Sequence, residues 1–147
     1  MIERILLAVD DSPDSLAATR LAVSLARELH AQLRAVHAVA DHEVDVALES
    51  ATGRPVGATR SHAVASLFAR VSSLAEAEGV AVDTVLLGGG IGTAILDAAR
   101  DWGADLVVIG KSARLATGEP YVGALARHVP EFADEPVLVV SARRRRR

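Results

Sequence analysis

The feature that most constrains this chain is an apolar run followed directly by a helix-start signal. Residues Ile2 to Val9 are almost all apolar, with one charged interruption, which is typical of a strand buried on both faces. Ser12 can then cap a helix, Pro13 suits its first position, and Asp14 complements its positive end. The sequence therefore predicts a buried strand that passes through a short turn into a helix.

The same alternation of strand and helix continues to the end of the chain. Further apolar strands are predicted at residues 33–39, 80–87, 105–109 and 136–140. Helices are predicted between them, with Gly79 and Gly103 as stops. Alternating strands and helices imply a parallel sheet with helices on both faces, joined by right-handed crossovers.

Periodicity also predicts which helix residues face the core. In the first helix we expect an apolar stripe of Ala18, Leu21, Ala22, Leu25 and Leu29, and in the helix over 59–78 a stripe of Val64, Leu67, Phe68, Val71 and Ala75. The segment from Lys111 to Tyr121 is predicted as polar loop. Pro130 is expected to kink or end the last helix near Val129, because proline lacks the backbone donor.

Composition and charge exclude several classes of protein. The 147 residues are 50% apolar and lack cysteine, so we expect one globular domain without disulfides or cysteine-ligated metal. The apolar run ending at Val9 is too short to cross a bilayer, and we expect a cytoplasmic protein with no membrane partner.

Five of the 16 cations are Arg143 to Arg147, which leaves 11 cations against 19 acids in the rest of the chain, a net charge near −8. We therefore treat residues 142–147 as an arginine-rich tail. An acidic body argues against nucleic-acid binding except through that tail.

Ligands of open parallel sheets bind beyond the carboxyl ends of the strands. Asp10 leaves the first strand at that edge and can accept hydrogen bonds from ribose hydroxyls or an adenine amino group; alternatively, it completes the helix cap. His42 lies among acidic residues in a spacing that matches no metal-ligand set, so we expect an exposed acidic loop and no metal site.

Two phosphate-related classes are excluded by the residues that are missing. Lys111-Ser112 follows Gly110 without the leading glycine of a P-loop. The end of the third strand, residues 86–90, supplies no aspartate for the phosphoacceptor of a receiver domain, and Lys111 precedes serine where a receiver has proline.

Four stretches carry a resemblance to a known family. They are Val9-Asp10 with Ser12, the glycine-rich turn before Thr93-Ala94-Ile95-Leu96, Ala104 to Gly110, and Pro136 to Val140. In this order and spacing they resemble the universal stress protein family over residues 1–141. The resemblance implies a flavodoxin-like three-layer α/β/α sandwich with strand order 3-2-1-4-5 and a stress-response role without catalysis.

The resemblance also implies a ligand site, because nucleotide-binding members hold ATP on a glycine motif. Here the motif's frame is Gly110, Ala113 and Gly123-Ala124, and any ligand would contact Asp10, Val39, Gly110, Arg114 and Gly123. Ala113 costs about 1 kcal/mol if its φ must be positive, and Ala124 forfeits a hydroxyl donor.

We therefore expect a regulatory or interaction module with weak or absent nucleotide binding. The alternative is a regulator that binds ATP, with Mg²⁺, because the spacing from Gly110 to Gly123 is retained. The final strand, Val137 to Val140, is apolar and expected at a sheet edge, where it can pair with a second copy. The resemblance likewise implies a homodimer through this strand, and the protein partner of such a module is not encoded in any motif.

Overall fold

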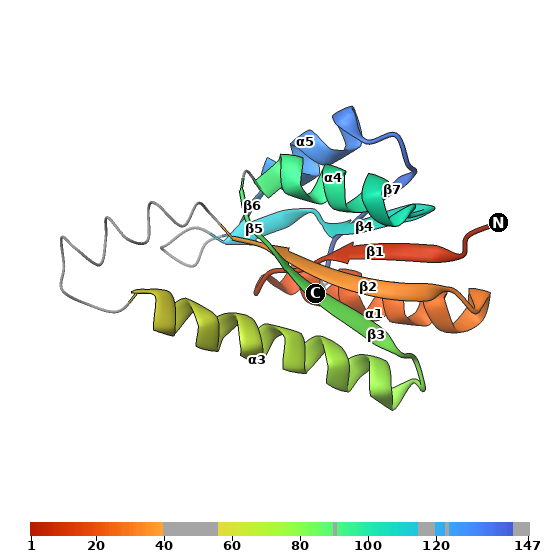
Figure 1. The fold of residues 1–147 in the computed structure, drawn as a ribbon, viewed down its shortest axis with the longest axis horizontal. Helices are drawn as coiled ribbons and strands as arrows, with labels where there is room; N and C mark the ends of the chain where they lie inside the picture. The colour runs from red at the N-terminus through yellow and green to blue at the C-terminus, as the bar shows by residue number, and fades with distance from the viewer. Residues whose placement is uncertain (40–55, 90, 115–119, 123, 143–147) are drawn as a thin grey trace, which may run out of the picture.

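The computed structural model describes residues 1–39, 56–89, 91–114, 120–122 and 124–142. Five parallel strands form its main sheet: β1 (Arg4–Ala8), β2 (Gln32–Ala38), β3 (Val82–Leu87), β4 (Leu106–Gly110) and β7 (Val137–Val140). Their order across the sheet is β3-β2-β1-β4-β7, so β7, the last of the five along the chain, lies at one edge. The predicted parallel sheet and its 3-2-1-4-5 order are confirmed (Figure 1).

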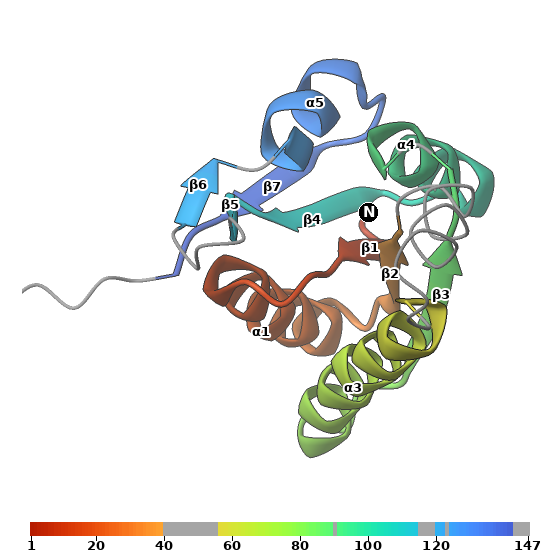
Figure 2. The same cartoon turned by 90° about the vertical axis from the view of Figure 1, so that its left-hand side faces the viewer.

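Helices cover both faces of the sheet, which confirms the three-layer sandwich. They are α1 (Pro13–Leu29), α3 (Val56–Ala77), α4 (Ile91–Trp102) and α5 (Ala124–Phe132). Figure 2 shows α1 and α3 on one face and α4 and α5 on the other. Alternate residues of β1 enter the two cores, Ile5 and Leu7 on the α1/α3 side and Leu6 and Ala8 on the α4/α5 side. This two-sided burial is why the strand reads as a continuous apolar run.

The start of α1 follows the predicted capping chemistry. Ser12 is the N-cap, and its Oγ accepts a hydrogen bond from the Ser15 N–H at 3.1 Å. Pro13 occupies the first turn, where a missing donor costs nothing. The predicted stops after α3 and α4 are also confirmed, because Gly79 and Gly103 have φ values of 68° and 72°.

The buried face of α1 differs from the predicted stripe. Leu21 and Leu29 are 37% and 44% exposed, whereas the buried residues of this helix are Ser15, Ala18, Thr19, Ala22, Val23 and Ala26. Small side chains line this face, which lets the helix pack closely on the sheet. By contrast, the predicted core positions Leu67, Val71 and Ala75 of α3 are buried as expected.

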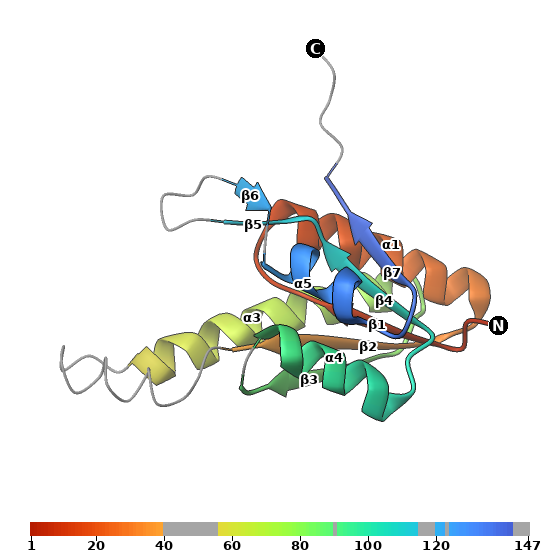
Figure 3. The same cartoon turned by 90° about the horizontal axis from the view of Figure 1, so that it is seen from above.

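In the C-terminal third the prediction of a polar loop was wrong, and the last helix runs three residues beyond Val129. The segment predicted as polar loop contains an antiparallel pair of short strands, β5 (Ser112–Arg114) and β6 (Pro120–Val122), which project beyond the carboxyl end of the sheet (Figure 3). Helix α5 does not end at Val129 but continues through Pro130 to Phe132. Pro130 is exposed and close to the helix end, and the Ala133 N–H still bonds to the Val129 carbonyl at 2.9 Å.

Candidate functional site

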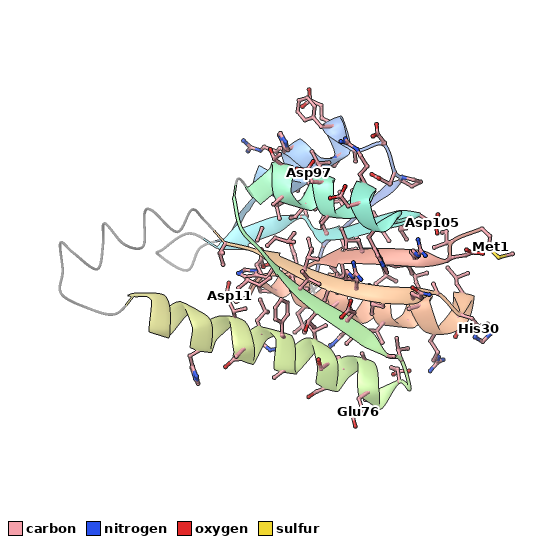
Figure 4. All side chains as sticks on the ribbon, in the orientation of Figure 1. Met1, Asp11, His30, Glu76, Asp97 and Asp105 are labelled. Carbon is pink, nitrogen blue, oxygen red and sulfur yellow. The ribbon has the colours of Figure 1, made fainter. Side chains whose placement is uncertain are left out.

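A cleft of about 330 Å³ lies at the carboxyl ends of β1 and β2, beneath the first half of α3. It is lined by Asp10, Asp11, His37, Ala38, Val39, Ala63, Val64 and Leu67. Figure 4 shows Asp11 at this end of the molecule. The location agrees with the rule that open parallel sheets bind ligands beyond the carboxyl ends of their strands. Two of the predicted site residues, Asp10 and Val39, therefore line one cleft.

Asp10 both shapes the turn and borders the cleft. Its Oδ1 accepts a hydrogen bond from the Ser12 N–H at 2.7 Å, and its own N–H donates to Ser15 Oγ at 2.9 Å. These bonds hold the link between β1 and α1, which is the structural role that the sequence left open. Because the half-buried Asp10 also lines the cleft, its carboxylate is available at the edge of a bound ligand as well.

His37 is a cleft residue that sequence reasoning placed only on a sheet face. Its Nδ1 lies 2.6 Å from the Val9 carbonyl oxygen, and a carbonyl can only accept, so Nδ1 carries a proton. In the neutral ring, Nε2 is then an acceptor. His37 lies two residues before Val39, which directly follows β2, and both residues line the cleft. That period-two spacing is the signal that would have found it.

The opposite wall of the cleft is apolar and comes from α3. Ala63 and Val64 are followed one turn later by the buried Leu67. No motif pointed to these residues as ligand contacts, because they are distant in sequence from the strand ends. An apolar wall facing polar acceptors on Asp10 and His37 suits a flat heterocycle that carries hydrogen-bond donors on its edge.

Gly110 lies against α1 and is not one of the residues that line the cleft. A Cβ at this position would lie 2.7 Å from the Ser15 backbone nitrogen and 2.9 Å from the Asp14 carbonyl carbon. Glycine here therefore allows the end of β4 to pack on the first turn of α1. Of the remaining predicted ligand residues, Arg114 ends β5, and Gly123 lies outside the described residues.

The backbone at Ala113 differs from the conformation on which its expected cost was based. Ala113 is the middle residue of β5 and pairs with Tyr121 of β6. In this extended conformation an alanine fits without the strain of a positive φ. The condition on which the cost of Ala113 depended, a positive φ, is therefore not met.

Asp14 connects three separate segments at the same end of the sheet. Its Oδ1 accepts a hydrogen bond from the Ala142 N–H at 2.7 Å, and Ser112 donates to the same carboxylate from its side chain and its backbone. Burial raises the pKa of Asp14, but these hydrogen bonds and the nearby charge of Lys111 outweigh it, so the pKa lies below its ordinary value. The carboxylate is thus held in its charged form.

A larger hollow of about 590 Å³ lies at the opposite end, around the amino ends of β2 and β3. Its charged side chains are already paired: Arg34 contacts Asp83 at 2.9 Å and stacks on Trp102, and Arg27 pairs with Glu78. The cleft at the carboxyl ends is therefore the candidate ligand site. Within the described residues there is no group of three potential metal ligands, and His42 lies outside them.

The fold and the cleft together define a doubly wound α/β domain of the flavodoxin-like type, with a cleft at the carboxyl edge of its sheet. The sequence profile of the universal stress protein family matches residues 1–141. The chain belongs to the universal stress protein family, as its motifs indicated.

Similar proteins support this assignment. Universal stress protein MJ0531 of Methanocaldococcus jannaschii is 28% identical over 141 residues, which is 95% of this chain and 82% of that protein. The structure of universal stress protein UspA from Lactobacillus plantarum has a TM-score of 0.77 at 26% identity, covering 95% of this chain and 97% of the other. The universal stress protein from Archaeoglobus fulgidus in complex with dAMP has a TM-score of 0.68 at 21% identity, covering 95% and 98%.

No helix among the described residues combines the length and the apolar character needed to span a membrane.

Proposed function

We propose that this protein is a regulatory module of the stress response whose cleft binds the base end of an adenine nucleotide weakly. The observation that carries this proposal is the cleft itself, in which Asp10 and His37 face the apolar wall formed by Ala63 and Val64. The adenine amino group can donate to either acceptor, and the ring can lie against the wall. The dAMP complex of the structural relative from Archaeoglobus fulgidus supports a nucleotide as the ligand class.

Weak binding follows from the contacts available to the phosphates. Ser112, the first residue of β5, lies beside Asp14 and lowers its pKa through its side chain and its backbone. Gly110 is occupied in packing against α1. A phosphate group at this edge would have to compete with contacts that the protein already makes.

The second candidate is an ATP-dependent regulator that binds ATP with Mg²⁺. It is favoured by Lys111, whose exposed side chain follows β4 and can approach a phosphate. Binding of ATP with a dissociation constant below about 10 μM, near −7 kcal/mol, would favour this candidate over the weak-binding module.

We propose no catalytic role for the cleft. Ser12 is 2% exposed and its Oγ already accepts from the Ser15 N–H, so it is not presented as a nucleophile. The Nδ1 of His37 is bonded to the Val9 carbonyl. Because these atoms already make hydrogen bonds within the protein, they favour ligand binding over acid–base or nucleophilic chemistry at this site.

We also propose a homodimer formed through β7. This strand is an edge of the main sheet and, among the described strands, pairs with β4 alone, and Val139 is 38% exposed. An apolar edge strand offers unpaired backbone groups to a second copy. The cytoplasmic location stays a prediction, which cell fractionation tests. A protein partner of the module would be recognised by binding that is lost when the dimer or the cleft is disrupted.

Isothermal calorimetry with adenosine, AMP and ATP, with and without Mg²⁺, tests the ligand assignment. Ala63→Trp fills the cleft from α3 and is expected to abolish adenosine binding. Ala65→Trp is the matched control, because Ala65 is exposed on the same helix and does not line the cleft. Equal adenosine affinity in Ala63→Trp and in the unchanged protein would show that the cleft is not the site.

A further inference from the structure

The Asp14 clamp, by which we mean Asp14 with its partners Ser112 and Ala142, joins the start of α1 to the ends of two strands. The Ala142 N–H lies 2.7 Å from Asp14 Oδ1. Ser112 contributes a backbone and a side-chain donor. One carboxylate therefore accepts the Ala142 N–H and has Ser112 beside it, so it links the chain just beyond β4 to the chain just beyond β7.

The clamp lies beside the cleft on the same side of the sheet. Asp14 belongs to α1, which packs on the same face as α3 (Figure 2), and Asp10 and Asp11 of the cleft immediately precede that helix. Ser112 follows β4, the direct neighbour of β1, so the ends of these strands are about 5 Å apart, one strand spacing. A ligand that leaves the cleft along the carboxyl edge next meets the clamp.

Phosphate groups would be disfavoured at the clamp for two reasons. Backbone N–H groups and hydroxyls are the donors that hold phosphates in proteins, and here Ser112 and Ala142 are already bonded to a carboxylate. The carboxylate also carries a negative charge, and like charges brought close together repel. Lys111 is a nearby cation whose charge contributes to the lowered pKa of Asp14.

We infer that Asp14 is a specificity-determining residue, which makes the neighbouring cleft select nucleosides over nucleotides. The inference rests on the function proposed for the cleft. It adds the class of ligand, an uncharged purine nucleoside, and it assigns the discrimination to a residue outside the cleft lining.

The test measures the ratio of ATP affinity to adenosine affinity by calorimetry in three variants. Asp14→Asn removes the charge and keeps an acceptor for the Ala142 N–H, whereas Asp14→Ala also frees the donors of Ser112. Asp105→Asn is the matched control. Its Oδ2 accepts the Glu3 and Arg4 N–H groups at 2.8 and 3.0 Å, and it lies at the opposite end of the sheet (Figure 4).

We expect both Asp14 variants to raise the ratio of ATP affinity to adenosine affinity by about tenfold, the scale of one charge contact in a partly exposed site. Asp105→Asn should leave the ratio within about twofold of that of the unchanged protein. Thermal melts confirm that each variant is folded under the conditions of the titration. An unchanged ratio in folded Asp14→Asn and Asp14→Ala overturns the inference.

A second probe separates this inference from the proposed function. Inorganic tripolyphosphate carries no base, so its binding does not depend on the cleft. It is expected to raise the melting temperature of Asp14→Ala and not that of the unchanged protein. If adenosine binds to none of the variants, the proposed function fails. The tripolyphosphate experiment then tests the role of Asp14 by itself. If tripolyphosphate does not raise the melting temperature of Asp14→Ala, the inference about Asp14 is overturned.

Discussion

Gly110→Ala should destabilise the protein because the end of β4 touches the backbone of α1. The added Cβ would lie 2.7 Å from the Ser15 nitrogen and 3.1 Å from the Ser15 Cα. Both are backbone atoms, so no side-chain rotation relieves the overlap. Either β4 or the first turn of α1 has to move, and the movement strains the bond from the Lys111 N–H to the Val140 carbonyl.

The expected magnitude is that of an overpacked core, about 1–3 kcal/mol. For a domain of this size, the loss corresponds to a fall in melting temperature of about 3–12 °C. Gly88→Ala is the matched control, because Gly88 also follows a strand of the main sheet, is exposed, and has room for a Cβ, which would meet no atom within 4 Å. Its effect should stay within about 0.5 kcal/mol.

Urea unfolding followed by circular dichroism measures both variants under the same conditions. An unchanged slope with a lower midpoint in Gly110→Ala would show that stability alone has changed. If Gly110→Ala and Gly88→Ala unfold at the same urea concentration, the close approach of β4 to α1 is not as the structure describes it, and the structural role given to Gly110 is refuted.

Two further predictions concern pH and assembly. The pKa of Asp105 is lowered by hydrogen bonds from the Glu3 and Arg4 N–H groups, and that of Asp14 is lowered as described above. A carboxylate whose pKa is lowered by folding stabilises the protein at pH values above its ordinary pKa of 3.8. This stabilisation is lost as the pH falls through the folded-state pKa. Acid unfolding curves should therefore be shallower for Asp105→Asn than for the unchanged protein, and parallel curves would contradict the assigned contacts. For assembly, Val139→Lys should convert the proposed dimer to monomer in sedimentation velocity, whereas Leu86→Lys at the opposite sheet edge should not; a dimer that survives Val139→Lys excludes β7 as its interface.

Local chemistry explains which parts of the fold were predictable. Ser12 and Pro13 start α1 through contacts within a few residues of each other, and such contacts are visible in the sequence. The β5–β6 pair was missed because its strands are only three residues each, too short to show a strand period in the sequence. Helix α5 extends three residues beyond Val129 although Pro130 has no backbone N–H to donate, and no local pattern indicated this extension.

The candidate site was predictable only on the strand side. Asp10 and Val39 follow buried strands, so the rule for parallel sheets placed them together. Ala63 and Val64 had no such signal, because their place in the cleft depends on how α3 crosses the strand ends. Gly110 was assigned to ligand binding for its motif, whereas its contact with Ser15 arises from helix packing.

Periodicity and neighbouring residues were enough to predict the five-stranded parallel sheet, the cap of α1 and the family. The packing of the layers was needed to show that small residues of α1 face the sheet, that α3 supplies one wall of the cleft, and that Asp14 contacts Ser112 and Ala142. The last of these joins residues separated by 128 positions in the chain. Contacts at that separation are set by the packing of the layers, which no local pattern of residues records.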